Sequence, residues 1–377
     1  MSNPASIYLD NASTTALEPK ALSAMESQWR EKVGNASSIH AAGVGAAMEL
    51  EKARAAIAGK IGAASADELL FTAGGSESNS LALLGYCRAH RGRGNHLIVS
   101  AVEHPSVLET AKQLGREGFE FSVCGVDSLG RVNEREFSSL FRKGTLLASV
   151  MHANNEVGTV NDLKELGSIT HEHGAVFHTD AVQSLGKEAL NMSELPVDFA
   201  SFSAHKLHGP RGIGALYIRA GTVIEPVTYG GGHERGLRPG TSNVEGAAGF
   251  ASALGAISES DLARMRELRD GLIRRLKAEG FRVNGCIERR LCNNVNLSFQ
   301  GNGKKALFAL SKRGIFVSTG SACQSNKNTP SHVLVAMGLG AQEVHGSLRV
   351  SLSKWTKASE LDVFLEALLH FARDGQT

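Results

Sequence analysis

The sequence predicts an α/β protein built around a mostly parallel β-sheet. From about residue 17 to residue 257, short apolar strands alternate with longer helical patterns, which places helices between parallel strands. Several of these strands end in polar residues, at the position where open α/β sheets bind ligands. After residue 257 the pattern changes to charged helices separated by short strands. The chain of 377 residues is long enough for two packed lobes.

Four strands of the first region have clear apolar runs, in HLIVSAVEH, TLLASVMHANNE, AVFHTDAV and VDFASFSAHK. The carboxyl ends of parallel strands meet at one edge of a sheet, so we expect the polar side chains that follow these runs to surround a common site. Those side chains are Glu103 and His104, Asn154 and Asn155, Asp180, and Ser203, His205 and Lys206.

The region after residue 257 predicts a smaller α+β domain. A charged helix, SESDLARMRELRDGLIRRLKAEG, leads to NNVNLSF, a further helix, GSLRVSLS and a closing helix. We expect the N-terminal segment to complete this domain. The predicted boundaries are 15–257 for the large domain, and 1–14 with 258–377 for the small one, which also carries the polar tract STGSACQSNKNTPS.

Composition narrows the possible partners. Lys and Arg total 40 against 38 for Asp and Glu, so no basic excess favours stable binding to nucleic acid or to a membrane surface. The start, MSNPASIYLD, lacks the pattern of a secretory leader, and no apolar run could cross a bilayer, so we expect a cytoplasmic protein. The five cysteines are scattered and form no C-x-x-C pair, so we predict neither disulfides nor a metal site.

Lys206 is the first candidate for chemistry. It follows a buried strand in SFSAHKLHGPRGIGALYI, where a desolvated amine could bond to an aldehyde cofactor. From this segment alone, Lys206 could equally be an ordinary solvated lysine at the end of a strand. A dinucleotide-binding reading has little support, because no G-x-G-x-x-G follows the first strand and GPRGIGALYI runs from a turn into a strand.

Two further segments fit such a cofactor. In HTDAVQS, Asp180 could keep a pyridine nitrogen protonated and Gln183 could bond a phenolic oxygen, although a lone Asp often only caps a helix. In FTAGGSESNSLAL, the pair Gly74–Gly75 and Ser76 precede a helix whose N-terminus could bind a phosphate, although such a pair is often only a turn. His104 could stack on the ring, although an isolated His is more often structural.

Together these segments resemble the cysteine desulfurases of the NifS/IscS type. The resemblance runs in the order of that family across nearly the whole chain. It rests on FTAGGSESN, EHPSVLET, HANNEVG, HTDAVQSLGK, SAHKLHGPRGIGALYIR, GGGHERGLRPGT and STGSACQS.

The resemblance implies a fold type I architecture with a mostly parallel seven-stranded sheet, an obligate homodimer, and pyridoxal 5'-phosphate bound through Lys206. It implies that Asn155 and Arg349 bind the substrate carboxylate, Arg349 through a two-pronged ion pair. The further cofactor contacts that it implies are His104 stacked on the ring, Asp180 at the ring nitrogen, Gln183 at the phenolic oxygen, Asn155 beside the cofactor, Gly75, Ser76, Ser203 and His205 at the phosphate, and Thr241 at the partner subunit's phosphate.

Cys323 is the nucleophile that the resemblance implies. The cysteine lies in a stretch rich in Ser, Gly and Asn, so we expect it on an exposed loop. Cys87, Cys124 and Cys292 fall in apolar patterns that predict burial, and Cys286, in a turn-like NGC, is the other cysteine expected to be exposed. An exposed thiol could receive sulfur in the site and carry it to an acceptor.

The predicted function is therefore the removal of sulfur from L-cysteine, with release of alanine and a persulfide on Cys323. A sulfur-acceptor protein, either a scaffold or a sulfurtransferase, would follow, for iron–sulfur clusters, thiolation or a cofactor. The alternatives are a cysteine or cystine C–S lyase or a selenocysteine lyase on the same fold, because fold does not fix the reaction. A non-catalytic regulatory subunit is disfavoured by Lys206, Asp180 and Cys323.

Overall fold

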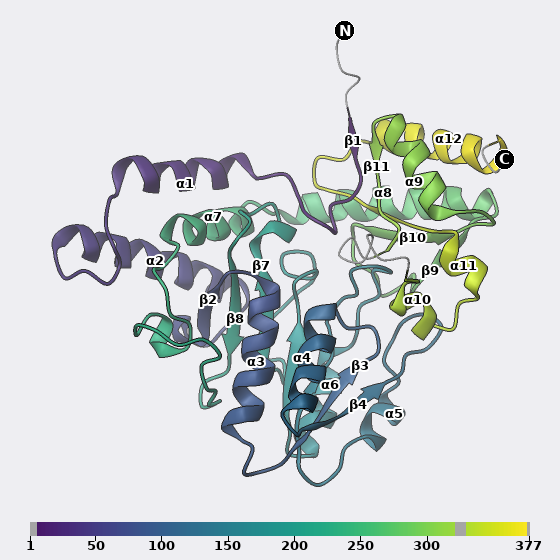
Figure 1. Ribbon diagram of the computed structural model, residues 1–377. Coiled ribbons are helices and arrows are strands. Elements are labelled where there is room, and N and C mark those ends of the chain that lie inside the picture. The colour runs from purple at the N-terminus through teal and green to yellow at the C-terminus, as the bar shows by residue number, and fades with distance from the viewer. Residues whose placement is uncertain (1–5, 321–328, 375–377) are drawn as a thin grey trace.

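The computed structural model describes residues 6–320 and 329–374. Its main feature is a seven-stranded sheet in the order β2-β8-β7-β6-β5-β3-β4 (Figure 1). Strand β8 is antiparallel to both of its neighbours, and the other pairs are parallel, which confirms the predicted mostly parallel sheet. The strands are β2 (Leu69–Thr72), β3 (His96–Ser100), β4 (Glu120–Cys124), β5 (Thr145–Ser149), β6 (Val176–Asp180), β7 (Phe199–Ser203) and β8 (Gly214–Ile218).

Helices cover both faces of this sheet. Consecutive strand residues such as Leu69 and Leu70 belong to different apolar clusters, one on each face. One face packs against α3 (Gly75–Ala89) and α4 (Pro105–Arg116). The other packs against α2 (Ala41–Lys60), α5 (Glu134–Ser139), α6 (Leu163–Glu172) and α7 (Val244–Gly255), with α1 (Pro19–Glu31) lying along α7 (Figure 1). This two-sided burial explains the continuous apolar runs of the central strands.

A second apolar cluster holds the C-terminal part of the chain together. It lies between a three-stranded sheet in the order β12-β10-β9 and three helices. The strands are β9 (Arg282–Asn284), β10 (Asn294–Ser298) and β12 (Ser347–Ser351), and the helices are α8 (Glu259–Ala278), α9 (Gly303–Lys312) and α12 (Ala358–Asp374). Two short helices, α10 (His332–Ala336) and α11 (Ala341–His345), precede β12.

The N-terminal segment joins this C-terminal part. Strand β1 (Ile7–Tyr8) pairs in parallel with β11 (Ile315–Phe316), and Leu9 contributes to the same apolar cluster as β10 and β12. The domain boundary at residues 257 and 258 stays a prediction. Among the described residues, no helix is both long enough and apolar enough to span a bilayer.

Candidate active site

A cavity of about 200 Å³ lies where the carboxyl ends of the central strands meet the N-terminal segment and β12. Its wall contains every residue to which the sequence assigned a catalytic, cofactor-binding or substrate-binding role, except Thr241 and Cys323. Thr241 is exposed and does not line this cavity, and Cys323 lies outside the described residues. The predicted residues in the wall are Gly75, Ser76, His104, Asn155, Asp180, Gln183, Ser203, His205, Lys206 and Arg349.

Lys206 lies one turn beyond the end of β7, in the 3-10 helix η2 (Ala204–Lys206). Its Nζ donates hydrogen bonds to the carbonyl oxygens of Ala12, at 2.7 Å, and Ser13, at 2.6 Å. The amine therefore lies between the carboxyl end of β7 and the N-terminal segment. Gln183 donates to the same Ala12 carbonyl, at 2.9 Å, so the two side chains share one anchor.

Asp180 is the last residue of β6, and its side chain is buried. Its Oδ2 accepts a hydrogen bond from Nδ2 of Asn79 at 2.7 Å, and its Oδ1 accepts one from the backbone N–H of Val182 at 3.0 Å. Both donors are uncharged amides. They orient the carboxylate toward the cavity without balancing its charge, and a protonated ring nitrogen would supply that balance.

His104 caps the N-terminus of α4. The backbone N–H of Ser106 donates to its Nδ1 at 3.1 Å, and Oγ of Ser106 lies 2.8 Å from the same atom. Burial lowers the pKa of His104 below its ordinary value, and the charge of Lys206 acts in the same direction, against the opposing effect of Asp180. The neutral ring therefore accepts at Nδ1 and carries its proton on Nε2.

The first turn of α3 forms one end of the cavity, with Gly75 and Ser76 in the wall. No side chain caps this helix at Gly74, so its first backbone amides are available to an anion. Ser203 and His205 contribute from the end of β7. Burial lowers the pKa of His205 to about 4, so its ring is a neutral hydrogen-bonding group at neutral pH.

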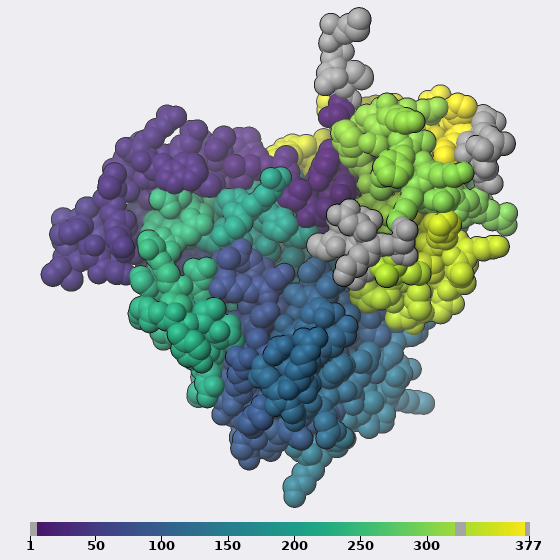
Figure 2. All heavy atoms as spheres, viewed as in Figure 1, coloured from purple at the N-terminus to yellow at the C-terminus, as the bar shows by residue number. Residues whose placement is uncertain are grey.

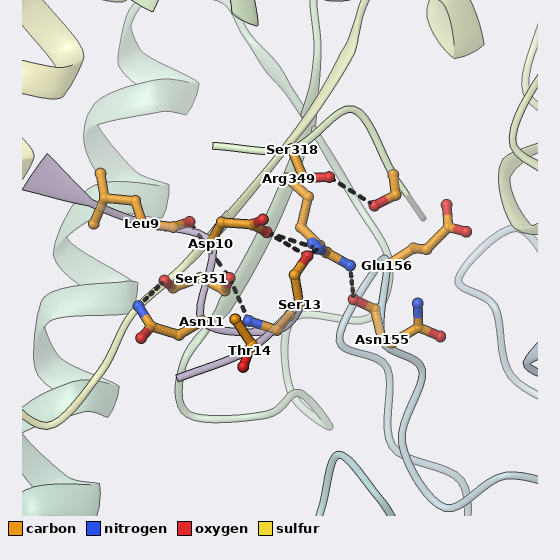
Figure 3. Close-up of polar contacts among 12 residues, drawn as sticks. Leu9, Asp10, Asn11, Ser13, Thr14, Asn155, Glu156, Ser318, Arg349 and Ser351 are labelled. Atoms are coloured by element: carbon orange, nitrogen blue, oxygen red, sulfur yellow. Dashed lines mark hydrogen bonds and ion pairs between the residues drawn. The ribbon is translucent and has the colours of Figure 1, made fainter. Parts of the chain in front are cut away.

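Arg349 lies on β12 and is almost completely buried. Its Nη2 donates to Oδ1 of Asp10 at 2.8 Å and to Oγ of Ser13 at 2.7 Å, and its Nη1 donates to the carbonyl oxygen of Asn155 at 3.0 Å (Figure 3). Its Nε is buried without a hydrogen-bond partner in the structure described. The guanidinium therefore lies in the cavity wall beside the N-terminal segment and Asn155.

Comparison with known proteins gives the family of this chain. The sequence model for Aminotransferase class-V matches residues 7–364. The chain belongs to the class-V aminotransferase family. Enzymes of this family use pyridoxal 5'-phosphate as their cofactor.

Individual proteins are similar to this chain over most of its length. A cysteine desulfurase IscS from Dictyoglomus turgidum is 44% identical over 368 residues, which cover 96% of this chain and 93% of that protein. Among solved structures, a NifS-like protein has a TM-score of 0.90 at 38% identity and covers 96% of this chain and 98% of its own. The structure of SspA in complex with cysteine has a TM-score of 0.84 at 33% identity, and the match covers 93% of this chain and 100% of SspA.

The class-V cofactor fits the residues present in the cavity. Pyridoxal phosphate carries an aldehyde, a ring nitrogen that works best protonated, and a phosphate. The cavity offers an amine at Lys206, a buried carboxylate at Asp180, and the uncapped start of α3. Asp180 ends β6, Lys206 follows the end of the neighbouring strand β7, and α3 packs on one face of the same sheet.

Sequence reasoning missed several residues of the cavity, which are Ala12, Ser13, Asn79, Ser106, Met151 and Val182. Asn79 could have been found, because it lies four residues after Gly75 on the same side of α3 and so reaches the same cavity. The N-terminal residues Ala12 and Ser13 had no local signal. They reach the site through contacts with residues 171 to 194 positions away.

Two expectations for strand-end residues were wrong. Glu103 and Asn154 do not line the cavity, although the residues after them, His104 and Asn155, do. Glu103 is instead bonded to the backbone N–H of Met151, and Nδ2 of Asn154 donates to the carbonyl of Val102. The reason is that successive residues of an extended chain point to opposite sides.

The predicted exposure of Cys286 was also wrong. This residue is 2% exposed, and its backbone N–H donates to Oγ1 of Thr159 at 3.0 Å. The turn that contains it packs against the segment around Thr159 instead of projecting into solvent. The predicted burial of Cys87, Cys124 and Cys292 is confirmed.

Proposed function

We propose that this chain is a cysteine desulfurase, which converts L-cysteine into L-alanine and holds the sulfur as a persulfide on Cys323. One observation carries the proposal: Lys206, Asp180 and Arg349 meet in a single cavity, in a chain similar to cysteine desulfurases over 96% of its length. The structure of SspA in complex with cysteine supports the same substrate for this chain.

The cofactor end of the cavity contains the groups that pyridoxal phosphate needs. When bound, this cofactor serves as an electron sink for the electron pair at the α-carbon of the substrate. We assign Lys206 as the residue that holds the cofactor aldehyde and then moves the α-proton. Asp180 would keep the ring nitrogen protonated, and Gln183 would bond the phenolic oxygen.

The phosphate would lie at the start of α3. Gly75 and Ser76 offer backbone amides there, and Ser203 and His205 offer side-chain groups from the adjacent end of β7. Thr241 would contribute to the phosphate site of a partner subunit. Its exposure, away from the cavity of its own subunit, supports this role.

The substrate end of the cavity contains Arg349 and Asn155. Arg349 would bind the α-carboxylate of cysteine, with Asn155 beside it. His104 would stack on the cofactor ring and act on protons at the substrate thiol. Its lowered pKa supports the stacking role, because a neutral imidazole stacks without placing a charge on the ring.

Cys323 would take the sulfur. Its thiolate attacks the sulfur of the substrate, a sulfur–sulfur bond forms, and the bond between that sulfur and the β-carbon breaks. The electron pair stays with the carbon skeleton, which takes up a proton and leaves as alanine. The overall exchange is one cysteine and one thiol for one alanine and one persulfide, so no outside oxidant or reductant is needed.

A homodimer and a sulfur acceptor belong to the same proposal. Apolar side chains of α1 and α2 and of the loop between them are exposed, among them Trp29 and Met48, and such a surface favours burial against a second copy. The acceptor would be a scaffold or sulfurtransferase protein that takes sulfur from Cys323. A cytoplasmic location stays a prediction from the sequence.

The variant Cys323→Ser tests this function. We expect it to bind the cofactor and change the visible spectrum when cysteine is added, but to form less than about 1% of the parental alanine, because a serine hydroxyl attacks sulfur poorly. Lys206→Ala is the matched control, and it should lose both the lysine-bound absorbance and the alanine.

The same assay separates the alternatives. Sulfide and pyruvate at near the parental rate from Cys323→Ser would identify a C–S lyase and overturn the proposal. Alanine from selenocysteine but not from cysteine in the parent would identify a selenocysteine lyase.

A further inference from the structure

Asp10 forms an ion pair with the arginine assigned to the substrate carboxylate. Its Oδ1 accepts a hydrogen bond from Nη2 of Arg349 at 2.8 Å, and the two side chains are 18% and 1% exposed (Figure 3). Ser13 lies between them: its Oγ donates to Oδ1 of Asp10 at 2.8 Å and accepts from Nη2 of Arg349 at 2.7 Å. One end of the guanidinium is therefore occupied before any ligand arrives.

The N-terminal segment fixes this carboxylate in place. Nδ2 of Asn11 donates to the carbonyl of Ser351 at 2.8 Å, and the backbone N–H of Ala12 donates to Oγ of Ser351 at 2.8 Å. Asp10 itself forms a parallel β-bridge with Ser351, two residues after Arg349 on the same strand. The carboxylate and the guanidinium thus belong to two backbone segments that are hydrogen-bonded to each other.

The remaining donors of Arg349 can still bind a second carboxylate. A guanidinium has five N–H groups in a planar fork. Nη2 donates to Asp10 and Ser13, Nη1 donates once to Asn155, and Nε is buried with no partner in the described structure. The second hydrogen of Nη1 has no partner in the described structure and is left for a ligand, whose carboxylate would share one cation with Asp10.

We propose that Asp10 is a positioning residue and a fixed counter-charge to Arg349, which weakens the binding of the α-carboxylate that substrate and product share. This inference rests on the assignment of Arg349 under the proposed function. Cysteine and alanine carry the same carboxylate. If an uncompensated buried cation bound this carboxylate, the pocket would bind the product alanine as tightly as the substrate cysteine. Asp10 offsets the charge of Arg349 in the empty pocket and lets alanine leave.

Removing only the charge of Asp10 tests the inference. In Asp10→Asn the Oδ1 atom can still accept from Nη2, so the arginine keeps its orientation while the repulsion between two carboxylates disappears. At a separation of about 5 Å in a partly buried site, that repulsion corresponds to about a tenfold change in affinity or more. We therefore expect the holoenzyme of this variant to bind L-alanine about tenfold more tightly in calorimetry.

A ligand without a carboxylate supplies the internal control. L-Alaninamide has the amine and methyl group of alanine but no carboxylate, so its affinity should be the same in the parent and in Asp10→Asn. The KM for cysteine should fall with the dissociation constant for alanine. Asp67→Asn, the same change at a position outside the cavity, should bind both ligands as the parent does.

The outcomes distinguish this inference from the function on which it rests. Alanine bound equally or more weakly by Asp10→Asn, with Arg349→Lys clearly weakened, overturns the counter-charge role and leaves Arg349 as the carboxylate site. Alanine affinity that is unchanged in Arg349→Lys overturns the assignment of Arg349 and the inference together. Tighter binding of alaninamide as well as alanine would also contradict the role of charge.

Discussion

Glu103 is fully buried one residue before His104 and shows how a single side chain can couple the stability of the fold to pH. Its Oε1 accepts hydrogen bonds from Oγ of Ser100 at 2.5 Å and from the backbone N–H of Met151 at 2.6 Å. Burial outweighs these bonds and raises the pKa of Glu103 to about 8. At neutral pH the folded protein therefore holds a proton on this group that the unfolded chain releases.

We predict that this proton makes stability fall as pH rises. The ordinary pKa of a glutamate is 4.5, and that of Glu103 in the folded protein is about 8. Between pH 4.5 and pH 8 the folded state therefore binds more protons than the unfolded state. Each unit of pH in this range lowers the free energy of unfolding by up to about 1.4 kcal/mol. Glu103→Gln imitates the protonated form and should lose this slope. Thermal unfolding at a series of pH values, with cofactor concentration fixed, measures the effect.

The exposed substitution Glu134→Gln is the matched control for Glu103→Gln, and it should follow the parent at every pH. Parallel stability profiles for the parent and Glu103→Gln would mean that Glu103 is ionised in the folded protein.

At the scale of elements, the start of α3 depends on close contact with the turn that follows β6. A β-carbon added at Gly75 would lie 2.5 Å from Cγ2 of Val182, well inside normal contact distance. Asp180 holds that turn by accepting from the backbone N–H of Val182. The glycine therefore sets the distance between the phosphate end and the ring end of the cavity.

We predict that Gly75→Ala weakens cofactor binding about tenfold, because the helix must move away from Val182. Helix propensity alone would favour alanine, so a loss must come from this contact. The double variant Gly75→Ala with Val182→Ala should recover much of the affinity. Absorbance titration of the apoenzyme with pyridoxal phosphate measures each constant.

Gly59→Ala, in a helix where the added β-carbon meets nothing within 4 Å, is the control for this series. A double variant no better than Gly75→Ala would show that the steric explanation is wrong.

At the scale of the whole molecule, α1 and α2 form an arm with an apolar surface. Figure 2 shows these two helices projecting from one side of the body. The exposed apolar residues of the arm are Leu22, Trp29, Val33, Ile39, Val44 and Met48, and Ile39 is 99% exposed. Apolar residues gathered on one element usually mark an interface, and scattered ones do not.

We predict that Trp29→Glu combined with Ile39→Glu weakens self-association at least tenfold, because the charges would have to be buried at the interface. Sedimentation velocity over a range of concentrations measures this, and activity should fall with dimer content if Thr241 serves the partner's site. Val363→Glu changes an exposed apolar residue of α12 and should leave association unaffected. A double variant that stays dimeric would place the interface elsewhere.

The sequence by itself determined the class of fold and most of the cofactor end of the site. The alternation of apolar strands and helices is visible in the sequence because it depends on local periodicity. The polar residues at the strand ends can be placed at one site because parallel strands share a direction. This is why His104, Asp180 and Lys206 could be assigned to one site from their positions along the chain. The roles of Thr241, Asn155 and Arg349 rest on resemblance alone, and Cys323 rests on resemblance together with its position in a polar stretch.

Only the tertiary structure decided how the N-terminal segment completes the site and whether Cys286 is exposed. Asp10 and Arg349 are 339 residues apart in the sequence, and Lys206 and Ala12 are 194 residues apart. Nothing in a local pattern encodes such pairs, because they form only when the pairing of β1 with β11 and the bridge to β12 bring the segment across the cavity. The burial of Cys286 was decided in the same way, by the packing of its turn against Thr159.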